Sequence, residues 1–186
     1  MGRLELRRPS RELSASFALL RDAFMIRGDN RWTEHRDLAH TDLNAYIDLL
    51  NSWSHGRLLP EGMVPADEFW IVEDNVVVGE IDVRRGLTPY LSEIGGQIGY
   101  LVHPEHRNRG VATFALRSAL DILKKLGWRE VVITCLDDNA ASARVIEKCA
   151  GKRIADSNVD WPLRRRYVFY CGSAELTDRS IHRRPS

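Results

Sequence analysis

The chain has 186 residues and a mass of 21.3 kDa, which favours a single domain. Its composition, with 44% apolar and 28% charged residues, is that of a globular protein and argues against extensive disorder. The net charge is only +1, so no overall field favours binding to nucleic acid or to an anionic membrane. The chain shows neither a long apolar run nor a secretory signal, and its three cysteines are widely spaced. We therefore expect a cytoplasmic protein without disulfides or a zinc site.

The N-terminal third reads as one strand and two helices. Residues 4–6 alternate apolar and charged side chains and predict a short strand. Apolar residues at spacings of three and four predict helices over residues 10–26 and 41–53. Residues 27–40 have no clear pattern, and the glycines and prolines of residues 54–65 predict a loop.

A hairpin follows, with strands at residues 69–73 and 76–85 around a turn at residues 74–75. Strict alternation places Val77, Ile81 and Val83 on one face and Val78, Glu80, Asp82 and Arg84 on the other. The second face is mixed in polarity, which fits either solvent or a polar cleft.

The remaining pattern alternates strands and helices. We expect a loop over residues 86–96 and a strand over 97–102, then a helix over 111–126 that ends at Gly127, and a buried strand over 131–136. A last helix should begin at Asp138 or Asn139 and stop at Gly151, before a final strand at residues 166–170. The chain is thus predicted to form one domain over residues 1–172, with a flexible tail at 173–186.

The segment 107–112, Arg-Asn-Arg-Gly-Val-Ala, lies between a predicted strand and the clearest helix. The first amides of a helix and its positive dipole end bind anions, and a glycine at position 110 lets a phosphate approach the backbone. The sequence lacks both the P-loop pattern and the dinucleotide fingerprint. We therefore predict a pyrophosphate site of another kind.

Two motifs in register resemble the GNAT (GCN5-related N-acetyltransferase) family. The family signature [R/Q]-x-x-G-x-[G/A] matches Arg107 to Ala112, and Val102-His-Pro104 matches the strand end before it. The stretch from Asp138 to Ser142, with Gly151 downstream, is similar to the second conserved block. The resemblance is closest to a bacterial branch, covers residues 69–170, and implies an α/β (α+β) fold. In that fold a mixed, mostly antiparallel twisted sheet with splayed central strands is flanked by helices.

The resemblance implies that acetyl-CoA is the cosubstrate and that no metal is needed. Its pantetheine arm would pair with the end of the strand near residues 101–103, and its pyrophosphate would lie on the amides of residues 108–113. The implied cofactor-binding residues are Leu101, Val102, His103, Arg107, Asn108, Arg109, Gly110, Val111, Ala112, Thr113, Asn139 and Ser142. For Asn139 a plain helix N-cap is the competing interpretation.

The chain departs from the family pattern at the general acid. Many members carry a tyrosine seven residues after the asparagine, where this chain has Ile146. The substitutes considered are Tyr100, Ser142 and Tyr167, and of these we select Tyr100 as the candidate catalytic residue. Glu80 is the first candidate for the base, because it lies on the polar face beside the predicted cofactor strand. Glu93, His103 and His106 are the alternatives.

The resemblance implies direct acetyl transfer to an amine of a small molecule or peptide. Two other functions stay open: an acyl-CoA-binding or sensor module without catalysis, and a transferase for a different acyl-CoA. The Arg84–Arg85 pair would either receive a carboxylate of the substrate or lie at an exposed strand end. Residues 164–166, three arginines, are predicted to be solvated surface. We expect neither nucleic acid nor membrane as a partner, and either a monomer or a homodimer.

Overall fold

The computed structural model describes residues 2–26, 36–157 and 163–171. The strands form two antiparallel sheets, which confirms the predicted fold class. The first sheet has the order β1 (Leu4–Arg7), β2 (Ala66–Glu73), β3 (Val76–Arg84) and β4 (Ile98–Val102). The second has the order β5 (Glu130–Leu136), β7 (Arg164–Tyr170) and β6 (Lys152–Arg153).

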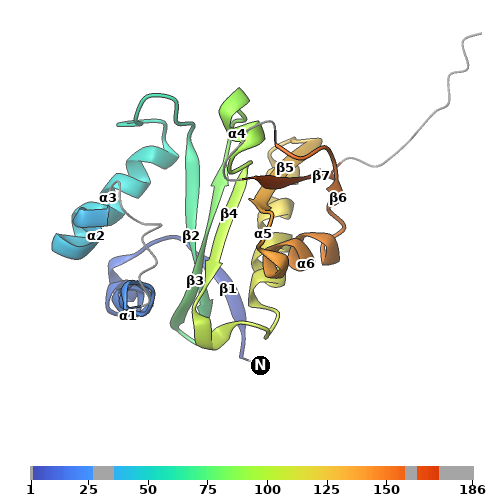
Figure 1. Cartoon of the computed structure of the whole chain (residues 1–186). Helices are drawn as coiled ribbons and strands as arrows, with labels where there is room; N and C mark the ends of the chain where they lie inside the picture. Colours follow the sequence, from blue (N-terminus) through green and yellow to red (C-terminus); the bar gives the residue numbers. More distant parts are fainter. Residues whose placement is uncertain (1, 27–35, 158–162, 172–186) are drawn as a thin grey trace, which may run out of the picture.

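Helices cover both faces of the four-stranded sheet (Figure 1). On one side lie α1 (Ser14–Met25), α2 (Arg36–Thr41) and α3 (Leu43–Ser54), and on the other side lie α5 (Val111–Lys125) and α6 (Ala140–Lys148). Short helices complete the chain: η1 (Arg11–Leu13), α4 (Pro89–Glu93) and η2 (Pro104–His106). No helix within the described ranges is long and apolar enough to cross a membrane. The predicted tail at 173–186 and most of the segment 27–40 lie outside the described residues.

The N-terminal helices pack on the sheet through an aromatic cluster. The Phe17 ring of α1 stacks on the Trp70 indole of β2 with centroids 4.5 Å apart, and both side chains are buried. The third helix begins where Asp42 caps it, since its Oδ1 accepts a hydrogen bond from the Ala45 N–H at 3.0 Å. This cap fixes the predicted start of the helix near residue 41.

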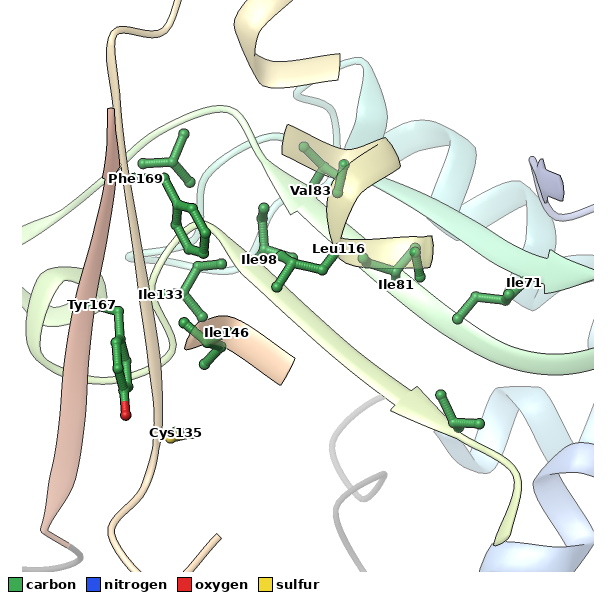
Figure 2. Packing of buried hydrophobic residues seen from close by; sticks show 14 of the residues in the cluster. Ile71, Ile81, Val83, Ile98, Leu116, Ile133, Cys135, Ile146, Tyr167 and Phe169 are labelled. Atoms are coloured by element: carbon green, nitrogen blue, oxygen red, sulfur yellow. The ribbon is translucent and has the colours of Figure 1, made fainter. Parts of the chain in front are cut away.

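The second core lies between the two sheets and α5. Figure 2 shows Ile98 of β4, Ile133 of β5, Leu116 of α5 and Ile146 of α6 converging on it, and all four side chains are buried. One core therefore joins two sheets that are not hydrogen-bonded along their length.

The predicted faces of β3 were wrong at its first residues. The register between β2 and β3 shifts so that Ile71 pairs with Gly79 while Val72 pairs with Val77, which leaves Val78 as the extra residue of a β-bulge. A bulge reverses the alternation, so Val78 joins the α5-side core, and Val77 packs with the N-terminal helices. Glu80 and Asp82, beyond the bulge, stay on one face as predicted.

Among the described residues, the backbones of the two sheets meet around Gly96, and beyond it β4 and β5 are not paired. Gly96 forms an isolated bridge with Ile133, and the Gln97 N–H donates to Val132 O at 2.7 Å. The Gln97 side chain is fully buried, and its Oε1 accepts from the Val132 N–H at 3.0 Å. Gly96 has φ +65°, and a Cβ there would lie 2.4 Å from Val132 O. Only glycine fits this close approach.

Two other local expectations need correction. The loop 86–96 contains α4, which begins where the Thr88 hydroxyl accepts from the Leu91 N–H. The left-handed residue after α6 is Ala150 (φ 71°) rather than the predicted Gly151. Gly151 is required for space, because a Cβ there would lie 2.6 Å from Ile146 Cγ2.

Replacing Gly96 by alanine should destabilise the fold through this contact. We expect Gly96→Ala to lower the free energy of unfolding by about 3 kcal/mol, from the cost of positive φ together with overpacking. Gly127→Ala is the matched control, since Gly127 has φ +88° with nothing within 4 Å of its Cβ position. It should cost only about 1 kcal/mol. An equal decrease in the free energy of unfolding for the two variants, measured by urea denaturation, would contradict the proposed close contact.

Candidate active site

The edge of β4 that faces away from β3 is open beyond the bridge to β5. On the β3 side, Gln97 O accepts a hydrogen bond and the His103 N–H donates one, each at 2.8 Å. Because main-chain groups alternate along a strand, those of Tyr100 and Val102 face the open edge. The N–H and carbonyl of Tyr100 and the N–H of Val102 can pair with an extended ligand in the manner of an added strand, whereas Val102 O accepts a hydrogen bond from Arg107 Nε.

A groove of about 570 Å³ runs from this edge to the start of α5. Asn108 and Gly110 both have positive φ, 60° and 80°, and turn the loop tightly into the helix. The first hydrogen bond of α5 is from the Phe114 N–H to Gly110 O at 2.9 Å, so the three preceding amides have no partner within the helix. These amides belong to Val111, Ala112 and Thr113, which line the groove. The residues of the predicted anion site therefore lie along the groove.

Basic side chains also line the groove. Arg107 lines the groove, and its Nε donates to Val102 O at 3.1 Å. Arg144 and Lys148 of α6 also line it and were missed in the sequence. Their spacing of four residues, which puts them on one side of a helix, is the signal that could have identified them.

The structure brings most of the predicted cofactor-binding residues together in this groove. They are Leu101, Val102, Arg107, Asn108, Gly110, Val111, Ala112, Thr113, Asn139 and Ser142. His103 and Arg109 are the exceptions. His103 caps η2, where its Nδ1 accepts from the Glu105 N–H. The Arg109 guanidinium turns away from the groove to Glu73.

Glu73, at the end of β2, anchors the loop that precedes α5. Its buried carboxylate lies 3.0 Å from Arg109 Nη2 and 3.1 Å from His106 Nδ1, and it accepts from the Gly2 N–H at 3.0 Å. Burial raises the pKa of Glu73, but the hydrogen bonds from Gly2 and His106 and the charge of Arg109 outweigh it, so the pKa lies below its ordinary value. His106, which also lines the groove, and Arg109 thus connect the loop before α5 to Glu73.

A second cavity of about 330 Å³ meets the groove at Tyr100, Leu101, Asn139 and Ser142, which line both. Asn139 caps α6, since its Oδ1 accepts from the Ser142 N–H at 3.0 Å, so its predicted capping role is observed. The Ser142 hydroxyl lies 2.8 Å from the Tyr100 hydroxyl. Burial raises the pKa of Tyr100 to about 12 despite the hydrogen bond with Ser142. The phenol is therefore protonated over the neutral range.

The second cavity has a charged lining. Glu80 and Asp82 enter it from β3, and Arg164 enters it from β7. The Glu80 side chain is buried, which places the predicted base in the cavity that adjoins the groove. Arg84 also lines the cavity, but its Nη2 is 2.9 Å from Asp82 Oδ2 and its Nη1 donates to Gly95 O and Gly96 O.

Three further positions considered for the acid or base lie outside both cavities, namely Ile146, Tyr167 and Glu93. Ile146, at the usual acid position, is fully buried in the core. The Tyr167 hydroxyl is directed to Glu147 Oε1 at 3.0 Å, and Glu93 pairs with Arg166 at 3.2 Å. None of these residues lines either cavity.

The consecutive arginines at 84–85 and 164–166 also differ from expectation. Arg85 donates to Ser54 O and pairs with Asp67, so it does not face the cavity. The three arginines of residues 164–166 are not simply solvated, because Arg165 and Arg166 are ion-paired and Arg164 lines the cavity.

Comparisons with known proteins agree with this geometry. Residues 3–152 match the family model described as "Acetyltransferase (GNAT) domain". N-alpha-acetyltransferase 30 of Schizosaccharomyces pombe is 28% identical over 114 residues, which cover 57% of this chain and 73% of that protein.

Solved structures share the fold. Mycobacterium smegmatis RimJ in complex with CoA-disulfide superposes with a TM-score of 0.70 at 20% identity, covering 95% of this chain and 85% of RimJ. The Salmonella typhimurium acetyl transferase that modifies the N-terminal serine of ribosomal protein L7/L12 gives 0.65 at 17% identity, covering 90% and 94%.

Gly110→Glu should abolish acetyl-CoA binding without unfolding the protein. It places bulk and negative charge against the amides of α5, and we expect a loss of about 100-fold or more in affinity by calorimetry. Gly62→Glu is the matched control, since Gly62 has φ +79° in an exposed loop with nothing near its Cβ position. It carries the same backbone strain and should leave affinity unchanged. Unchanged affinity in Gly110→Glu would place the phosphate site elsewhere.

Proposed function

The chain belongs to the GNAT acetyltransferase family and is an acetyl-CoA-dependent N-acetyltransferase, and from this premise we propose that it acetylates the N-terminal α-amine of a protein or peptide by direct transfer. The observation that carries this proposal is the junction of the two cavities at Tyr100 and Ser142. A thioester lying in the groove and an amine lying in the charged cavity would meet there. The S. pombe and S. typhimurium relatives, by their names, act on N-terminal amines, which supports the choice of acceptor.

The groove suits acetyl-CoA in both charge and shape. The amides of Val111 to Thr113 and the side chains of Arg144 and Lys148 would hold the phosphates. The N–H and carbonyl of Tyr100 and the N–H of Val102 would pair with the amides of the pantetheine arm. This pairing would direct the thioester toward the junction of the cavities, where the open edge of β4 can supply an N–H to the developing oxyanion.

The acceptor amine must lose a proton before or during attack. An α-amine with a pKa of ~8 costs about 1.4 kcal/mol to deprotonate at pH 7, whereas a lysine amine at ~10.4 costs about 4.6 kcal/mol. Glu80 is the carboxylate placed to accept this proton, directly or through a water. Because a single carboxylate is a modest base, the smaller cost favours an α-amine as the acceptor.

Tyr100 is the proposed acid for the leaving thiolate. Glu80 first passes the ammonium proton on to solvent. The new C–N bond then forms as the C–S bond breaks; the second proton on the nitrogen passes to Glu80, and the phenol proton passes to the sulfur. The Ser142 hydroxyl at 2.8 Å orients the phenol and can stabilise the phenolate that remains. The pair spans β4 and α6, so it replaces the acid that is missing at Ile146.

The buried Ile146 also favours a second candidate, an acyl-CoA-binding module without turnover. That function requires the groove alone. A third, transfer of another acyl group, differs only in the donor. The following experiment separates all three.

Peptides with a free N-terminus should be acetylated at that amine alone. We would incubate the protein with acetyl-CoA or succinyl-CoA and a peptide that also contains an internal lysine, and map the product by mass spectrometry. The same peptide with a blocked N-terminus is the control and should not react. Tight acetyl-CoA binding with no product from any free amine would support the binding module instead.

Tyr100→Phe should lower kcat by about 100-fold, the usual contribution of a general acid. Because the pKa of Tyr100 is raised to about 12, the wild-type rate should show no decline between pH 8 and pH 10. Tyr90→Phe, at an exposed position of α4, is the control and should match wild type. A descending limb below pH 10 that disappears in Tyr100→Phe would show a phenol of ordinary pKa and contradict this prediction.

A further inference from the structure

We propose that the acceptor carries a carboxylate close to its amine and that Arg164 binds this carboxylate. The inference rests on the proposed function, because it takes the charged cavity as the acceptor site. It deepens that function by naming a substrate class, an amine with an acidic neighbour.

The three consecutive arginines of β7 differ in their partners. Arg165 Nε lies 2.7 Å from Asp137 Oδ1, and Arg166 Nη1 lies 3.2 Å from Glu93 Oε1. The Arg164 guanidinium makes no hydrogen bond or ion pair with any residue that the structure describes, and its Nε is buried. Arg164 therefore stands apart from its neighbours as a cation that faces the cavity.

The backbone holds Arg164 in this position. Its N–H donates to the Ser157 hydroxyl at 3.1 Å, and its carbonyl accepts from the Ser157 N–H at 3.0 Å. It also pairs with Leu136 in the β5–β7 ladder. A buried guanidinium nitrogen without a partner is costly, and a bound carboxylate would remove this cost through two parallel hydrogen bonds.

The charges of the cavity divide into two ends. Asp82 and Arg84 neutralise each other at 2.9 Å, and Arg84 is further held by the carbonyls of Gly95 and Gly96. The other two charged residues of the lining are Glu80 of β3, which is anionic when ionised, and Arg164 of β7, which is cationic, and they enter from different sheets. The arrangement matches a ligand with an ammonium at one end and an anion at the other.

The anion is assigned as a carboxylate because of its charge. A phosphate monoester carries about −1.5 to −2 charges and would face Glu80 and Asp82 with only one unpaired arginine to balance it. A carboxylate carries one charge and fits the planar fork of a single guanidinium. Two sources are compatible with a cavity of about 330 Å³: an acidic side chain at position one or two of a peptide, or the α-carboxylate of a free amino acid.

The test compares carboxylate acceptors with their amide isosteres. The acceptors are peptides that begin Asp-Ala, Asn-Ala, Ser-Asp and Ser-Asn, together with free alanine and its α-amide. We expect kcat/KM to be about tenfold or more higher for the acidic member of a pair, mainly through KM. The peptide pairs report a side-chain carboxylate, and the free amino-acid pair reports an α-carboxylate.

Arg164→Gln should abolish this preference, and Arg164→Lys should restore part of it. Arg165→Gln is the matched control, because it removes the neighbouring charge, which is already paired with Asp137, and it should keep the preference. Equal rates on both members of each pair in wild type, or a preference that persists in Arg164→Gln, would overturn the proposal.

Calorimetric binding of the same pairs to the protein with CoA gives a readout that does not depend on turnover. A preference for acidic ligands that Arg164→Gln removes would support the inference even if no acetylation occurred, in which case the proposed function alone would fail. Acetylation of neutral and acidic peptides at equal rates and equal affinities would keep the proposed function and reject the inference.

Discussion

The divergence of β4 from β5 is the constraint on which the rest of the molecule depends. The two strands meet at Gly96 and Ile133, where only a glycine allows the backbones to approach. Beyond this point the sheets separate, and the main-chain groups of Tyr100 and Val102 face the gap. A continuous sheet would have satisfied these groups internally and left no edge for a ligand to pair with.

Where β4 and β5 are not paired, side chains make hydrogen bonds to some of the main-chain groups. Gln97 takes the place of a strand neighbour for Val132, and the Arg107 guanidinium satisfies Val102 O. Further along, Tyr100 and Ser142 bridge the gap through their hydroxyls. Each contact joins the first sheet to an element beyond it, and Tyr100, Val102, Arg107 and Ser142 also line the groove. The core under the split, shown in Figure 2, fixes the angle between the sheets.

The proposed chemistry follows from how the two cavities share a wall. The usual position for the acid on α6 holds Ile146, which instead fills the core against Gly151. A hydroxyl at the junction therefore has to come from another element, and β4 provides it with Tyr100. The proposed acceptor cavity is likewise assembled from separate strands, with Glu80, Asp82 and Arg84 from β3 and Arg164 from β7. Chemistry and specificity thus depend on the relative placement of the two sheets.

The sequence by itself determined the features that are local in the chain. The start of α5 at Gly110, the cap at Asn139 and the apolar spacing of α5 depend on neighbouring residues, so these elements and the fold class could be predicted from them. Only the tertiary structure decided which charges meet. Arg109 turns to Glu73, 36 residues away in the chain, and Arg164 faces the cavity while Arg165 and Arg166 are paired. The bulge at Val78 likewise depends on the register with β2. Ion pairs and register join residues distant in sequence, and composition and periodicity carry no information about such distances.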